Sequence, residues 1–130
     1  KILNDIDWRI VNDTKYTDKS IAVLLKHIVN WRVFVIKKLQ GNETYDIIID
    51  EANDWTKVSV HNEEEWLQLL KEIVNSQEQL LSILATHDDQ ILLKKVPGKD
   101  YDFGSILPSI AQHDLYHLGQ IAMLNVTYKS

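Results

Sequence analysis

The stretch that decides how this chain folds is Gln112-His113-Asp114-Leu115-Tyr116-His117-Leu118-Gly119-Gln120-Ile121. It belongs to a longer segment with apolar residues at helical spacing, which predicts an amphipathic helix. Two histidines four residues apart on a helix lie on one face, with Cβ atoms roughly 5–6 Å apart. At that distance the imidazoles of His113 and His117 can share one metal ion.

A third histidine, His27, lies in a second apolar segment with helical periodicity, residues 24–31. Three histidines from two helices would leave a bound metal ion with open coordination positions. Open positions are typical of catalytic metal sites, whereas structural zinc sites are closed by four protein ligands.

A core role is the alternative interpretation of these histidines. A lone His on an apolar helix face is usually a core residue satisfied by one hydrogen bond. The pair is harder to explain in this way, because burying two imidazoles one turn apart is costly unless something pairs with both. Asp114 is turned about 100° from His113 around the helix and is therefore a poor co-ligand. His61 and His87 fall at helix ends or in loops, where we expect them to be solvated.

Composition limits the remaining possibilities. The chain has 130 residues, which is typical of a single domain, here 1–130. It has no cysteine, so disulfides and thiolate metal sites are excluded and a reducing, cytoplasmic location is expected, although many exported proteins also lack cysteine. The net charge of −5 argues against nucleic-acid binding. No apolar run approaches the roughly 18 residues of a membrane span. Residue 1 is Lys, which leaves open a preceding signal segment or helix.

Three long amphipathic helices are predicted, over residues 18–40, 62–86 and 105–126. Asn62 as the N-cap with Glu65 three residues later resembles a capping box. Pro108 would be the third residue of the last helix, where its missing N–H has no partner to lose. Three such helices leave an apolar groove that a fourth helix would fill. We expect either that residues 1–7 end a truncated fourth helix or that a partner chain covers the groove, with a two-fold homodimer as the default.

The connections are less clearly patterned. Residues 42–61 form a long crossover in which residues 46–50 are a candidate short strand, and residues 88–93 are expected to add a helical turn or two. An acidic cluster in the crossover lacks the spacing of a calcium loop and is expected to form a solvated face; its members are Asp46, Asp50, Glu51 and Asp54. Neither a glycine-rich phosphate loop nor a nucleophile elbow is present.

Several segments together resemble the DinB-like (DinB/YfiT) family. Residues 25–32 followed by 39–41 are similar to the second helix of that family. Residues 96–103, leading into the His-x3-His-x-Gly-Gln pattern of residues 113–120, are similar to its last helix. The resemblance extends from about residue 18 to residue 126.

The resemblance implies an all-α four-helix bundle in up-down-down-up order, with a long crossover between the second and third helices. The first helix of the family would be mostly missing or truncated here. The resemblance also implies a divalent metal ion, nickel, zinc or manganese, held by His27, His113 and His117. Understood relatives transfer or isomerise groups on low-molecular-weight thiols, and others are described as metal-dependent hydrolases.

We therefore expect a metal-binding protein that acts on a small molecule, either as a thiol S-transferase or as a hydrolase. A non-catalytic helical module, in which metal only stabilises the bundle, is the third alternative. Trp31, Gln77 and Tyr116 are candidate pocket-lining residues, but the two aromatic residues fit a core or interface role equally well, and Gln77 fits the edge of an apolar stripe.

Overall fold

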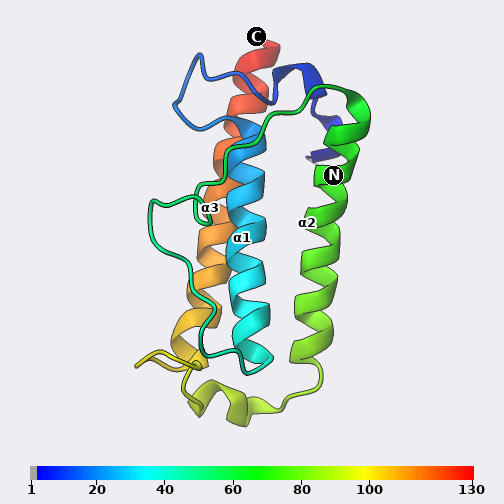
Figure 1. The fold of residues 1–130 in the computed structure, drawn as a ribbon. Coiled ribbons are helices and arrows are strands. Elements are labelled where there is room, and N and C mark those ends of the chain that lie inside the picture. Colours follow the sequence, from blue (N-terminus) through cyan, green and yellow to red (C-terminus); the bar gives the residue numbers. More distant parts are fainter. Residues whose placement is uncertain (1–2) are drawn as a thin grey trace.

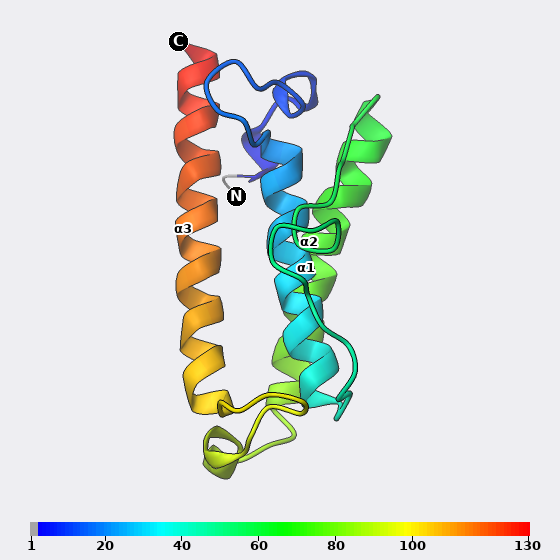
Figure 2. The ribbon, with the colours of Figure 1, turned by 60° about the vertical axis from the view of Figure 1, so that its left-hand side comes forward.

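The computed structural model describes residues 3–130, and its secondary structure there is entirely helical apart from one isolated bridge. Three α-helices form the body: α1 (Ile21–Leu39), α2 (Glu63–Leu84) and α3 (Phe103–Lys129). Short 3-10 helices cover Leu3–Asp5, Trp8–Ile10 and Asp89–Leu93. α1 and α2 run in the same direction and α3 runs back (Figure 1, Figure 2). The down-down-up order predicted for the last three helices is therefore present.

Side-chain caps set where each helix begins. Ser20 accepts a hydrogen bond from the N–H of Val23, so α1 begins three residues later than predicted. Asn62 caps α2 as predicted. Asp102 caps α3, which therefore begins at Phe103 and makes Pro108 the sixth helical residue rather than the third. The predicted position of Pro108 was wrong, and at its actual position proline removes one hydrogen bond inside the helix.

The candidate strand over residues 46–50 is also wrong, because this segment is an irregular loop with a turn. Asn53 folds the segment back on itself: its side-chain amide donates to the carbonyl of Asp46 and accepts from the N–H of Ile48. Only Ile47 of the three consecutive isoleucines is buried. Residues 88–93 do contain a helical turn, of the 3-10 type. Of the predicted stub at residues 1–7, residues 1–2 lie outside the described part, and Leu3–Asp5 is a 3-10 helix.

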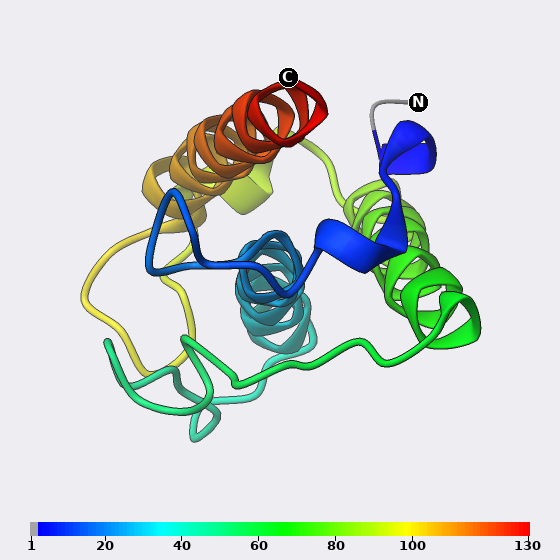
Figure 3. The same ribbon diagram turned by 90° about the horizontal axis from the view of Figure 1, so that it is seen from above.

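α1 is the central helix, with α2 on one side and α3 on the other (Figure 3). Buried residues of α1 contribute to two hydrophobic clusters. Ile21, Leu25 and Ile28 belong to the cluster near the start of the helix, and Phe34 and Val35 belong to the cluster near its end. The crossover 40–62 runs along α1 and joins it to the start of α2 (Figure 1). Within residues 3–130, no helix is long and apolar enough to cross a membrane.

Candidate metal centre

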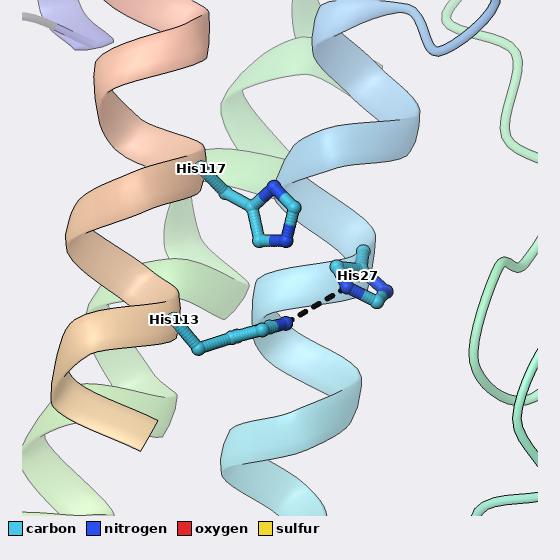
Figure 4. Close-up of side chains that lie close together, drawn as sticks. All are labelled: His27, His113 and His117. Carbon is cyan, nitrogen blue, oxygen red and sulfur yellow. Dashed lines mark hydrogen bonds between the residues drawn. The ribbon is translucent and has the colours of Figure 1, made fainter. Parts of the chain in front are cut away.

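The three histidines singled out in the sequence come together between α1 and α3. His27 projects from α1 toward His113 and His117, which project from α3 one turn apart (Figure 4). One ligand-type nitrogen from each ring lies within 4.8 Å of the other two. His27 and His117 are buried, and His113 is partly exposed. The predicted convergence is present, and metal binding by it stays a prediction.

Hydrogen bonds to the far side of two rings assign their tautomers. His27 Nδ1 lies 2.9 Å from the carbonyl oxygen of Asp54 and 3.0 Å from its Oδ1. His117 Nδ1 lies 2.6 Å from Gln120 Oε1. All three partner atoms are acceptors, so both Nδ1 atoms carry the proton and donate it. Each ring therefore presents a bare Nε2, the form in which neutral imidazole binds a metal ion.

Beside His113, two buried polar atoms lack hydrogen-bond partners. Its Nε2 lies 2.8 Å from Nε2 of His27, so His113 has to donate a proton there. Its Nδ1 is then bare and faces Asp114 Oδ1 at 3.6 Å, and both of these buried atoms lack a hydrogen-bond partner. Two acceptors facing each other in a buried position are unfavourable.

A divalent cation held by the three histidines would resolve this arrangement. With Nε2 of His113 on the ion, its proton would move to Nδ1, which faces Asp114 Oδ1 at 3.6 Å. The donor set and the two unpaired atoms both fit a metal ion.

Electrostatics favour the metal-ready state. Burial lowers the pKa of His27, and the neighbouring imidazoles lower it further, against the hydrogen bond that Nδ1 donates to the backbone carbonyl of Asp54. Burial likewise lowers the pKa of His117, against the hydrogen bond to Gln120. Both rings are therefore neutral at pH 7, and no proton has to be displaced from Nε2 of either ring before a metal ion binds.

Asp54 is a site residue that the sequence analysis missed. It was predicted to lie on a solvated acidic face, yet it is only 3% exposed. Its carbonyl accepts from His27 Nδ1, and its carboxylate accepts from Trp31 Nε1 at 2.8 Å and from the N–H of Asp50 at 2.9 Å. The other three residues of that acidic cluster are exposed, as predicted. Nothing in the spacing of these four acids distinguishes the buried one.

Trp55 was also missed. Its ring stacks on that of His27, with centroids 3.6 Å apart and an interplanar angle of 1°. Lys19 Nζ lies 4.4 Å from the centre of the Trp55 ring. The crossover thus covers one face of His27 with an aromatic ring while Asp54 bonds its edge.

The charge beside His113 is neutralised by an ion pair. Arg32 Nε donates to Asp114 Oδ2 at 2.8 Å, and the same guanidinium donates to the carbonyl of Ile73 at 2.8 Å. Asp114, predicted to be a poor co-ligand, is therefore engaged by an arginine from α1.

The three candidate pocket residues have different fates. Trp31 lies beside the cluster, 6.0 Å from His113 between ring centroids. Tyr116 is mostly exposed, lies 5.1 Å from the His117 ring, and lines an apolar groove along α3. Gln77 lines the groove between α2 and α3, which Asp114 also lines, and a role for it in a substrate pocket stays a prediction. His61 and His87 are exposed, as predicted.

A helical frame with three histidines converging from two antiparallel helices defines a candidate metal-binding bundle. Comparison with known proteins places it further: the family model of the DinB superfamily matches residues 4–121, so the chain belongs to the DinB superfamily. No curated protein and no solved structure matches it.

Proposed function

We propose that this protein binds one divalent metal ion, nickel, zinc or manganese, through Nε2 of His27, His113 and His117, and uses it to transfer a small thiol to an electrophilic substrate. The thiol sulfur would form the new bond, and the electrophile would release its leaving group. The observation that carries the proposal is the set of three imidazole nitrogens within 4.8 Å of one another. Among residues 3–130, no fourth protein ligand belongs to this set. Such a set leaves room for a substrate atom on the ion.

The bound ion would hold a thiol as its thiolate at neutral pH, or lower the pKa of a bound water. The chain's own residues hold the three rings neutral and correctly turned. Trp55 keeps water from one face of His27. The apolar groove beside His117, which Tyr116, Leu24 and Met123 line, offers a place for the organic part of a substrate.

Thiol transfer is favoured over hydrolysis by the state of the two nearby carboxylates. Asp54 is occupied by His27 and Trp31, and Asp114 is held by Arg32. Neither is free to act as a general base toward water. A thiol bound as thiolate is already the nucleophile and needs no such base.

The experiment uses untagged protein loaded separately with each of the three metals. Consumption of a low-molecular-weight thiol is followed in the presence of an alkylating electrophile, with His113→Ala as the control. Metal-dependent loss of thiol in the wild type alone supports the proposal. Ester hydrolysis without thiol transfer would support the hydrolase alternative. Bound metal that raises thermal stability without any turnover would support the non-catalytic module.

We also propose that a second copy of the chain covers the groove between α2 and α3, where the resemblance implies a first helix. Support comes from α2, whose outer face carries three exposed apolar residues at seven-residue spacing: Leu67, Val74 and Leu81. That spacing is typical of a helix packed against another helix.

A further inference from the structure

Asp54 is unusual among the loop residues around it. It is 3% exposed, whereas Glu51, Ala52 and Asn53 directly before it are exposed. Carboxylates are rarely buried unless they are paired, because desolvation of the charge is costly. A buried carboxylate in the middle of an irregular crossover therefore needs a reason.

The donors around Asp54 are all neutral. Oδ1 accepts from Trp31 Nε1 and lies 3.0 Å from His27 Nδ1, whose hydrogen bond goes to the backbone carbonyl of Asp54, and Oδ2 accepts from the backbone N–H of Asp50. Within the described residues, no lysine or arginine forms an ion pair with it, in contrast to Asp114 and its partner Arg32. The negative charge of Asp54 thus has a single route to a counter-charge, through the imidazole of His27.

Two consecutive crossover residues hold the His27 ring in place. Asp54 bonds the edge of the ring at Nδ1, and Trp55 stacks on its face. Asn30, on α1, secures this part of the loop by donating to the carbonyl of Asp54 at 3.2 Å and to Thr56 Oγ1 at 2.9 Å. The orientation of Nε2 is therefore set by the loop as well as by the helix.

We propose that Asp54 is a positioning residue for His27. Its carboxylate, held by Trp31 and the N–H of Asp50, keeps the Asp54 carbonyl against Nδ1 of His27 and, through this ring, supplies negative charge to the metal ion. This inference rests on the proposed metal site. Carboxylate–histidine–metal arrangements orient the ligand and increase its basicity, and loss of the outer partner typically weakens metal binding about 10–100-fold.

The test uses Co²⁺ as a spectroscopic probe in the full chain. In Asp54→Ala, the affinity for Co²⁺ falls about 10–100-fold and the visible absorption bands change, because the loop loses its bonds to Trp31 and Asp50 and the His27 ring loses the adjacent negative charge. Asp54→Asn keeps the shape and an acceptor oxygen but removes the charge, so we expect it to restore the tautomer and only part of the affinity. Glu51→Gln, an exposed acid three residues away in the same loop, is the matched control and leaves both readouts unchanged.

A second readout needs no metal. Side-chain ¹⁵N shifts of His27 in chelator report which ring nitrogen carries the proton. We expect Nδ1–H alone in the wild type. In Asp54→Ala we expect a mixture of tautomers, because the carbonyl of residue 54 loses the carboxylate bonds that hold it against Nδ1. An unchanged tautomer together with unchanged Co²⁺ affinity in Asp54→Ala overturns the proposal. If the wild type binds no Co²⁺, the proposed function fails, and so does the proposal that Asp54 supplies charge to the ion. The ¹⁵N shifts still decide whether Asp54 positions His27.

Discussion

The seam between α1 and α3 and the groove between α2 and α3 are opposite in character. The seam buries polar and ionisable groups, among them His27, His117, Arg32 and Asp54. The groove is lined mainly by apolar residues, among them Leu80, Leu84, Leu107 and Leu118, and the Arg32–Asp114 ion pair lies at its base. Helix α1 packs directly against α3 at the seam, whereas α2 and α3 pack on different sides of α1 (Figure 3).

The two regions have different requirements: a polar interior needs hydrogen-bond partners, and an exposed apolar surface needs apolar cover. Buried polar groups have to be paired, and most of those in the seam are. Three buried side-chain atoms of the described residues have no partner: His113 Nδ1 and Asp114 Oδ1, which could pair with each other once a metal ion occupied His113 Nε2, and Asn125 Oδ1, which lies elsewhere on α3. An exposed apolar stripe has no unsatisfied hydrogen bonds and lacks only cover. The seam therefore predicts a small ligand, and the groove predicts a macromolecular partner.

The largest effect expected in the seam is loss of metal from His113→Ala. Removing one of three ligands leaves two imidazoles, which hold a divalent ion far more weakly. We expect bound metal to fall from about one ion per chain to a trace after buffer exchange, measured by elemental mass spectrometry on untagged protein. His61→Ala is the matched control, because His61 is exposed and bonds only Glu65. Equal metal content in both variants would show that the cluster is not the site.

The histidines were predictable because helical periodicity places residues that are four apart on one face. The pairing of His113 with His117 needs no tertiary information, and His27 lies in a strongly periodic segment. The three long helices were predictable for the same reason. Their starts were less so, because the choice between Thr17, Asp18 and Ser20 as the cap of α1 depends on a single side-chain hydrogen bond.

Asp54 and Trp55 were not predictable, because their positions depend on loop geometry. The crossover is shaped by side-chain bonds from Asn30 and Asn53 and by Asp50, which has a left-handed φ of 67°. No periodicity encodes such contacts. The same bonds explain why residues 46–50 do not form a strand despite their three isoleucines.

The second effect concerns the ion pair in the seam. Arg32→Met leaves Asp114 buried without a counter-charge, and breaking a buried pair in this way costs about 3–5 kcal/mol. We expect the free energy of unfolding in urea, measured with chelator, to fall by about that amount. Adding Asp114→Leu should recover part of the loss, since the second change removes the unpaired charge. A loss below about 0.5 kcal/mol, as for surface substitutions, would mean that the pair is effectively solvated.

A smaller effect, on self-association, is expected on the exposed apolar stripe of α2 beside the groove. Val74→Lys places a charge in the middle of the exposed apolar stripe on α2, and we expect self-association to weaken at least about ten-fold, or about 1.4 kcal/mol. Sedimentation equilibrium at several concentrations measures it. Gln79→Lys introduces the same side chain at another exposed position of α2 and serves as the control. A wild-type chain that is monomeric at every concentration would refute the homodimer.

The smallest expected effect distinguishes the two regions by pH, since the seam contains the histidines and the groove is lined by none. Burial lowers the pKa of His27 and His117, so without metal the folded chain binds fewer protons at these rings than the unfolded chain, whose histidines titrate near about 6.5. At a pH well above about 6.5, these two histidines do not affect stability, because they are neutral in both states. As the pH falls through about 6.5, the unfolded chain takes up more protons and the free energy of unfolding falls. The rings face Asp54, Gln120 and His113, and none of these contacts reverses the direction. Urea unfolding in chelator at pH 7.5, 6.5 and 5.5 measures the slope. The variant His27→Gln/His117→Gln should show a shallower decline over this range, and an equal decline would show that the seam histidines are protonated as easily in the folded chain as in the unfolded one.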